Sequence, residues 1–146
     1  MRDEYDIREL TPDPFPYSYW NAYLNTEKVQ KALGAFVNYT GDGGNTVYSA
    51  FSNTGDDDRE DGTIEACRKL VEQGVYVFQY AGDADYNCNW LGGQAVAEEI
   101  NAPGFRDAGY TNITTSDHVV HGQVKQSNNY AFARVYESGH EVRKPF

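Results

Sequence analysis

Two stretches of the sequence each place a side chain suited to proton transfer directly after an apolar strand pattern. In residues 75–90 the apolar run leads into Asp83 and Asp85, and in residues 132–142 a similar run leads into His140. A buried carboxylate that holds a histidine in one tautomer allows the imidazole to act as a general base, as in a Ser-His-Asp triad. The serine of such a triad is expected in a Gly-x-Ser-x-Gly turn, and this motif is absent from the 146 residues.

The composition is typical of a folded protein with an acidic surface. Hydrophobic residues make up 40% of the chain, aromatic residues make up 14%, and the formal net charge at pH 7 is -10. Because nucleic acids and anionic membranes attract surfaces rich in Lys and Arg, we expect neither as a partner. The longest apolar runs are too short for a membrane-spanning helix. The first residues, Met1-Arg2-Asp3-Glu4, carry acids where a signal peptide requires apolar residues, so none is predicted here.

Two cysteines and two sequons carry weaker information. Cys67 falls on the apolar stripe of an expected helix and is interpreted as a buried thiol. The segments that begin at Asn38 and Asn112 match the Asn-x-Ser/Thr acceptor of N-glycosylation. Asn38 and Asn112 are therefore candidate glycosylation sites if the protein is secreted.

A helix and a strand must position the two acids. The pattern predicts a helix that Thr63 caps and Gly74 ends. A strand over residues 75–81 follows, and its two apolar faces are typical of a central parallel strand. The apolar stripe of the helix consists of Ile64, Cys67, Leu70 and Val71.

The elements that follow must position the histidine. A second helix is predicted from Asn89, and a loop over residues 101–115 comes after it. A hairpin then has arms over residues 119–124 and 130–136 with its turn at residues 127–129. This alternation of helix and strand predicts an α/β fold class.

The first part of the chain has a different character. Prolines among aromatic residues predict an extended segment within residues 1–24, followed by a short helix. A second helix is expected from the cap at Thr26 to Gly34. Residues 41–45 and 53–62 are predicted loops.

Seven motifs occur along the chain in a characteristic order. They are Tyr5-Asp-Ile-Arg8, Pro12-Asp-Pro-Phe-Pro16, Tyr23-Leu-Asn25, Val29-Gln-Lys-Ala-Leu-Gly34, Gly82-Asp-Ala-Asp-Tyr-Asn-Cys-Asn-Trp-Leu-Gly92, Gly122-Gln-Val-Lys125 and Ala133-Arg-Val-Tyr-Glu-Ser-Gly-His-Glu-Val142. In this order the sequence resembles the serine carboxypeptidases, especially their fungal and yeast-type branch. The resemblance covers nearly the whole chain and corresponds to roughly the last third of a full-length member.

The resemblance implies an α/β-hydrolase fold, of which this chain would be the C-terminal part, with an incomplete parallel sheet and flanking helices. Residues 1–60 would form helices and loops on the side of a helical insertion, and residues 61–146 would contain the strands that carry acid and base. Three predicted strands cannot form a sheet with covered edges, which also indicates one end of a larger domain.

The activity implied by the resemblance is removal of single residues from peptide C-termini, best at acid pH. Asp85 and His140 match the catalytic aspartate and histidine of the family, in the acid-then-base order of α/β-hydrolases. Asn87 and Cys88 match the wall of the pocket for the residue before the scissile bond. Glu141 matches a residue that faces the pocket for the leaving amino acid. No cofactor and no metal are implied.

The serine belongs to an earlier portion of family members, so this chain alone is expected to be inactive. The expected partners are the C-terminus of a peptide substrate and a nucleophile-bearing chain. An extracellular or vacuolar glycoprotein is implied. The alternative from another class is a non-catalytic product, either an inactive truncated protein or a pseudoenzyme that only binds. A small chain of a two-chain enzyme is a further alternative.

Other motifs admit chemical interpretations that compete with these. Asp83, Asp85 and Asn87 match positions 1, 3 and 5 of an EF-hand loop. Cys88 stands where that loop requires Gly, and Gln94 stands where it requires Glu, so calcium binding is not favoured.

Three further patterns are explained most simply by surface structure. His118 and His121 have a spacing that suits a metal on a helix, but in a strand they would point to opposite faces. Residues 41–45 lack the Lys-Ser/Thr of a phosphate-binding loop. The acidic run in residues 56–61 is interpreted as a solvated surface.

Overall fold

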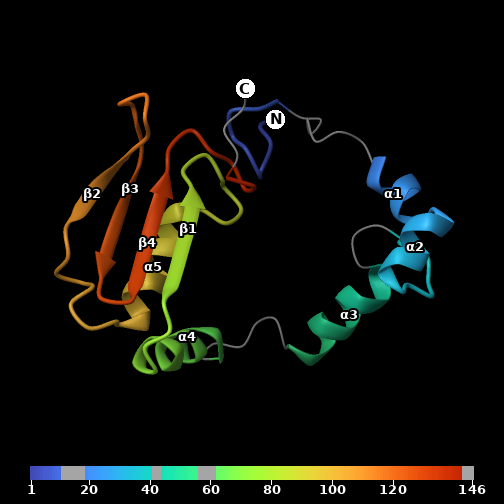
Figure 1. Cartoon of the computed structure of the whole chain (residues 1–146), viewed down its shortest axis with the longest axis horizontal. Coiled ribbons are helices and arrows are strands. Elements are labelled where there is room, and N and C mark those ends of the chain that lie inside the picture. Colours follow the sequence, from blue (N-terminus) through green and yellow to red (C-terminus); the bar gives the residue numbers. More distant parts are fainter. Residues whose placement is uncertain (11–18, 41–43, 56–61, 143–146) are drawn as a thin grey trace. The chain divides into compact units, whose positions relative to one another are not determined.

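A computed structural model describes residues 1–10, 19–40, 44–55 and 62–142 of the chain (Figure 1). The chain divides into two compact units. One unit combines Met1–Pro14 with Asp61–Phe146, and the other consists of Phe15–Glu60. The first unit contains the sheet and both residues of the expected acid–base pair.

The first unit contains a four-stranded mixed sheet with the order β1-β4-β3-β2 (Figure 1). The strands are β1 (Val77–Gly82), β2 (Tyr110–Thr114), β3 (Val120–Ser127) and β4 (Tyr130–Val135). β1 and β4 are parallel, with Gly82 paired to Val135 at their carboxyl ends, and the other two pairings are antiparallel. The predicted α/β class is confirmed, and so is the predicted hairpin.

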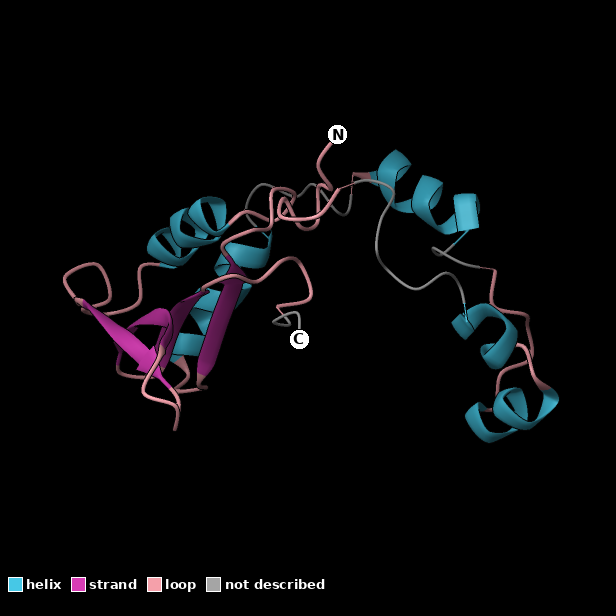
Figure 2. Ribbon diagram, turned by 90° about the horizontal axis from the view of Figure 1, so that it is seen from above, coloured by secondary structure: helices cyan, strands magenta, loops and turns pink. Residues whose placement is uncertain are grey.

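Two helices pack on one face of this sheet, as the ribbon seen from above shows (Figure 2). They are α4 (Gly62–Glu72) and α5 (Trp90–Ile100). Asn89 is the N-cap of α5, as predicted, and its side chain accepts the N–H of Gly92. Burying one large apolar side chain stabilises a fold by roughly 1.5–3 kcal/mol. The helices and the sheet share a buried core of Val71, Ala97, Ile100, Ala102, Phe105, Tyr130 and Phe132.

Within the described residues of the first unit, the opposite face of β1 is uncovered. Val77 and Ala81 pack against the core, whereas Phe78 is 52% exposed and Tyr80 is 58% exposed. β1 is also the end strand of the described sheet, so the predicted central position is not observed. The sequence of β1 is apolar on both faces, but the two helices cover only one of them.

Two secondary-structure predictions in this unit need correction. Residues 101–115 were expected to form a loop, but β2 occupies Tyr110–Thr114 and pairs with β3. The sequence of β2 is short and mostly polar, so its pairing partner rather than its pattern specifies it. Thr63 does not cap α4, because the helix begins at Gly62. Cys67 is half-buried rather than buried and packs against the core.

The second unit is helical over its described residues. It contains α1 (Tyr19–Leu24), α2 (Glu27–Leu33) and α3 (Gly44–Thr54). Gly34 ends α2 with a positive φ of 67°, as the sequence predicts. α3 was missed, because glycines at its start made the segment resemble a loop. The acidic run in residues 56–61 lies outside the described residues.

Across the described segments, no helix combines the length and the apolar character that crossing a bilayer requires.

Candidate active site

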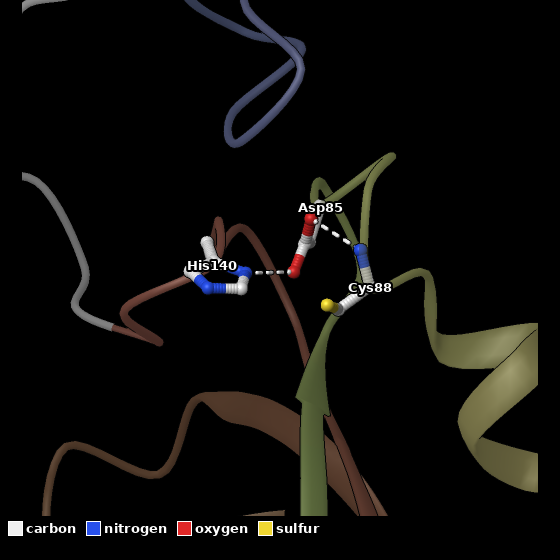
Figure 3. Close-up of side chains that lie close together, drawn as sticks. All are labelled: Asp85, Cys88 and His140. Carbon is white, nitrogen blue, oxygen red and sulfur yellow. Dashed lines mark hydrogen bonds and ion pairs between the residues drawn. The ribbon is translucent and has the colours of Figure 1, made fainter. Parts of the chain in front are cut away.

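Asp85 lies in the loop between β1 and α5, and its carboxylate is almost completely buried. The residue is 5% exposed. Oδ1 accepts the backbone N–H of Cys88 at 3.0 Å, which closes the loop into a turn. Oδ2 lies 2.9 Å from Nδ1 of His140 (Figure 3). One oxygen therefore shapes the loop, and the other oxygen is available for the histidine.

His140 follows β4 and meets Asp85 through one ring nitrogen. An ionised carboxylate can only accept hydrogen bonds, so Nδ1 of His140 must be the donor in this contact. The proton on Nδ1 leaves Nε2 as the basic nitrogen of a neutral imidazole. The side chain is 41% exposed, and Nε2 has no hydrogen-bond partner within the described segments. The imidazole is thus oriented on one side and open on the other, which is the arrangement of a general base.

The sheet topology explains why two residues far apart in sequence meet. β1 and β4 are parallel neighbours, so the loops after them leave the same end of the sheet. The N–H of Asp83 donates to the backbone carbonyl of Val135 at 3.0 Å, and the N–H of Ala84 donates to the backbone carbonyl of Ser138 at 2.9 Å. A Cβ on Gly82 would lie 2.2 Å from the carbonyl oxygen of Ser138. The loops approach so closely that only glycine fits at this position.

Asp83 joins the two loops through its side chain, a role that the sequence did not reveal. Its Oδ1 accepts the N–H of Glu137 at 2.8 Å, and its Oδ2 lies 3.3 Å from Nη2 of Arg134. The guanidinium of Arg134 stacks 4.0 Å from the centroid of the Trp90 ring. The two carboxylates therefore have different roles. Asp83 connects the two loops, and Asp85 contacts His140.

The residues matched to substrate pockets lie next to the pair. Asn87 and Cys88 follow Asp85 in the same loop and are exposed, and Glu141 follows His140 and is also exposed. A carboxylate oxygen of Asp85, the Sγ of Cys88 and a ring nitrogen of His140 all lie within 4.8 Å of one another (Figure 3). The calcium interpretation finds no support, because a strand precedes the loop and the two acids are bonded to Arg134 and His140.

The other two histidines do not lie together on one strand. His118 lies in the turn before β3 with a positive φ of 61°, and His121 lies on β3. Nε2 of His121 is 3.0 Å from Oδ2 of Asp117. Hydrogen bonds from the Thr115 hydroxyl, the Val119 N–H and the His121 ring hold the pKa of the Asp117 carboxyl well below its usual range. The contact between His121 and Asp117 stabilises the turn between β2 and β3. Among the described residues, no group of three possible metal ligands includes His118 or His121.

Comparisons with known proteins show the family of the chain. The model of the family described as serine carboxypeptidase matches residues 2–145. Carboxypeptidase S1 homolog B of Arthroderma otae is 42% identical over 144 residues, which cover 97% of this chain and 22% of that protein. Carboxypeptidase S1 of Penicillium janthinellum is 38% identical over 144 residues, which cover 96% of this chain and 33% of that protein.

A solved structure of Kex1(delta)p, a prohormone-processing carboxypeptidase from Saccharomyces cerevisiae, is also similar. Its TM-score is 0.47 with 26% identity, over 54% of this chain and 18% of that chain.

The chain belongs to the serine carboxypeptidase family. This membership confirms the resemblance drawn from the motifs. The chain spans between about a fifth and a third of the length of the two curated relatives named above.

Proposed function

We propose that the chain contributes the aspartate and the histidine of a serine-type carboxypeptidase, and that the serine lies outside these 146 residues. The observation that carries the proposal is the 2.9 Å contact between Oδ2 of Asp85 and Nδ1 of His140. Asp85 is the acid because it is buried and bonded to the imidazole. His140 is the base because its second ring nitrogen is the one turned away from Asp85 (Figure 3).

In the proposed reaction, Nε2 of His140 removes the proton of the serine hydroxyl as the serine oxygen attacks the scissile carbonyl. The same nitrogen then gives the proton to the nitrogen of the departing amino acid. Asp85 keeps the proton of Nδ1 in place and stabilises the imidazolium that forms between the two steps. A serine already present near the pair does not suit the nucleophilic role. Ser138 is 1% exposed, and its hydroxyl donates to the carbonyl of Tyr136.

The neighbouring residues are proposed to recognise the peptide. Asn87 and Cys88 would contact the residue before the scissile bond. Cys88 would form part of the pocket wall, since the nucleophilic role is assigned to a serine outside these residues. Glu141 would favour a basic leaving residue through charge attraction.

The uncovered face of β1 supports a second half of the enzyme as partner. The rings of Phe78 and Tyr80 lie 5.8 Å apart on that face and are both more than half exposed. Adjacent exposed aromatic rings beside an unpaired strand edge are unfavourable in water, and a further part of the sheet would cover them. A continuous longer chain and a separate nucleophile-bearing chain both satisfy this requirement. We also propose that the protein is secreted or transported to the vacuole, and that it is glycosylated at Asn38 and Asn112.

The proposal can be tested in a hybrid enzyme in which these residues replace the matching part of the Penicillium janthinellum relative. We expect the hybrid to release C-terminal amino acids from blocked dipeptides, and the 146-residue chain alone to release none. His140→Ala should lower kcat about 1,000-fold or more, and Asp85→Asn should lower kcat by a similar or smaller factor.

His121→Ala is the matched control, because His121 is also paired with an aspartate and should leave turnover unchanged. Full turnover by the His140→Ala hybrid would show that the base lies elsewhere.

A further inference from the structure

The first ten residues of the chain, called here the N-terminal strap (residues 1–10), contact both loops of the proposed acid–base pair. On the side of Asp85, the N–H groups of Tyr86 and Asn87 donate to the carbonyl of Glu4 at 3.1 and 3.0 Å. The N–H of Ile7 donates to the carbonyl of Ala84 at 2.9 Å. The strap therefore binds the backbone immediately before and immediately after Asp85.

On the side of His140, a single strap residue makes two contacts. The backbone N–H of His140 donates to the carbonyl of Tyr5 at 2.8 Å. The ring of Tyr5 also lies against the imidazole, with centroids 5.0 Å apart and an interplanar angle of 61°. Edge-to-face contacts of this kind contribute about 0.5–1.5 kcal/mol beyond area burial and restrict the relative orientation of the rings. Arg8 adds a third link, because its guanidinium donates to the carbonyl of Glu137.

The strap has a defined shape of its own. Asp3 is 6% exposed, and its Oδ1 accepts the N–H groups of Tyr5 and Asp6 at 2.7 and 3.1 Å. The Asp6 carboxylate is paired with the guanidinium of Arg8, and the hydrogen bond from Arg8 lowers the pKa of Asp6. Arg2 donates to the carbonyl of Arg8 at 2.7 Å. These hydrogen bonds within the strap hold the backbone on both sides of Tyr5 in a fixed turn.

Gly139 gives independent support for this close approach. A Cβ on Gly139 would lie 2.6 Å from the carbonyl oxygen of Tyr5 and 2.8 Å from the side chain of Asp6. The residue directly before the histidine must therefore be glycine if the strap is to pass where it does.

We propose that Tyr5 is a positioning residue for His140, and that the N-terminal strap holds both loops in register. The inference rests on the proposed function, since its purpose is the orientation of the base. The side chain of His140 is 41% exposed, so general packing restrains it little. A catalytic side chain must be held within about 0.5 Å and 10–20° of its working geometry. Asp85 fixes one atom of the imidazole, and the Tyr5 ring restrains the plane of the imidazole.

The closing experiment uses NMR spectra of the 146-residue chain, which require no turnover. The two probes are the Nδ1 proton of His140 and hydrogen exchange at the backbone amide of His140. Tyr5→Phe keeps the ring and the backbone acceptor, so both probes should match the unchanged chain. Tyr5→Leu removes the ring, so the Nδ1 proton should broaden or disappear and the His140 amide should exchange about 10-fold faster or more.

Tyr86→Leu is the matched control, because Tyr86 lies beside Asp85 but its side chain is 74% exposed. It should leave both probes unchanged. The amides of Phe132 and Ala133 in the buried core should keep their protection in every variant, which excludes general unfolding.

Two results would overturn the inference. One is an unchanged Nδ1 proton and His140 amide in Tyr5→Leu, and the other is an equal effect of Tyr86→Leu. In the hybrid enzyme, Tyr5→Leu should lower kcat with little change in KM, and Tyr5→Phe should restore kcat. An inactive hybrid with the expected NMR behaviour would count against the proposed peptidase reaction and leave the positioning contact intact.

Discussion

The Oδ1 atom of Asp83 accepts the backbone N–H of Glu137 at 2.8 Å, and this bond ties the loop of Asp85 to the loop of His140. Glu137 has a positive φ of 52°, a conformation that a residue with a side chain adopts only when its surroundings impose it. Asp83 supplies that constraint from the neighbouring loop. The two members of the proposed pair are therefore coupled through a residue that takes no part in proton transfer.

Asp83→Ala should lower the free energy of unfolding by about 1–3 kcal/mol, because the N–H of Glu137 and the guanidinium of Arg134 lose an acceptor. Urea denaturation monitored by Trp fluorescence measures the change. Asp107→Ala is the control, since Asp107 is exposed and its replacement should stay within about 0.5 kcal/mol of the original. Equal stability of the two variants would show that the Asp83 bond contributes nothing.

Gly82→Ala should be more disruptive than its size suggests. The new Cβ would lie 2.2 Å from a backbone oxygen of Ser138, so one loop must move, at a cost of about 2 kcal/mol or more. Gly109→Ala provides the comparison, because nothing lies within 4 Å of a Cβ there. That variant should be neutral or more stable by up to about 1 kcal/mol. Thermal unfolding of both variants decides the matter, and similar melting temperatures would contradict the packing described.

The Asp6–Arg8 pair predicts a pH-dependent contribution to stability. The hydrogen bond from Arg8 lowers the pKa of Asp6 in the folded state, so the unfolded state binds the proton more tightly. The contribution is therefore present above the unfolded pKa of about 4 and is lost as the pH falls below it. Asp6→Asn should cost up to about 1 kcal/mol at pH 7, and the difference from the original chain should shrink as the pH falls from about 4 through the lowered pKa of Asp6 in the folded state. Denaturation curves across this range test the sign, and a difference that grows on acidification would refute it.

Phe78→Ser separates folding from assembly. Because Phe78 is 52% exposed, the substitution should change the stability of the chain by no more than about 0.5 kcal/mol. It should weaken association with a separately produced nucleophile-bearing part about 10-fold or more, since apolar area is no longer buried there. Tyr48→Ser on α3, where the ring is 73% exposed, is the control and should not affect association. Isothermal calorimetry supplies both affinities, and equal values would remove β1 from the interface.

Glu141 predicts substrate preference in the hybrid enzyme. Glu141→Gln should reduce the ratio of kcat/KM for C-terminal Lys over C-terminal Leu by up to about 5-fold, the value of a partly exposed charge pair of about 1 kcal/mol. Turnover of the Leu substrate should hardly change. Equal turnover of both substrates by the unchanged hybrid would exclude the assignment before any substitution is made.

The proposed acid and base could be located from the sequence because each follows a strand, and parallel strands deliver their loops to one end of a sheet. The strand pattern placed both Asp83 and Asp85 at this end, and the family resemblance selected Asp85 as the partner of His140. β2 could not be predicted in this way, because its residues become a strand only by pairing with β3. Asp83 was recognised as an acid, but its tie to Glu137 depends on a positive φ in a loop far along the chain.

The N-terminal strap escaped prediction for a related reason. Its motif, Tyr5-Asp-Ile-Arg8, contains no hydrophobic period, so it carried only the family resemblance. Its importance comes from contacts across almost the whole length of the chain. Sequence patterns indicate local secondary structure, and they do not indicate which distant N–H group will donate to a given backbone carbonyl.

The contact between Tyr5 and His140 joins residues that lie 135 positions apart in the sequence. A ribosome releases residues in order, so Tyr5 and Asp85 emerge while His140 is still being synthesised. The proton-transfer pair and its aromatic support can therefore assemble only after residue 140 has been synthesised and β4 has aligned beside β1. Any nascent chain that stops short of residue 140 is left with an acid and no base.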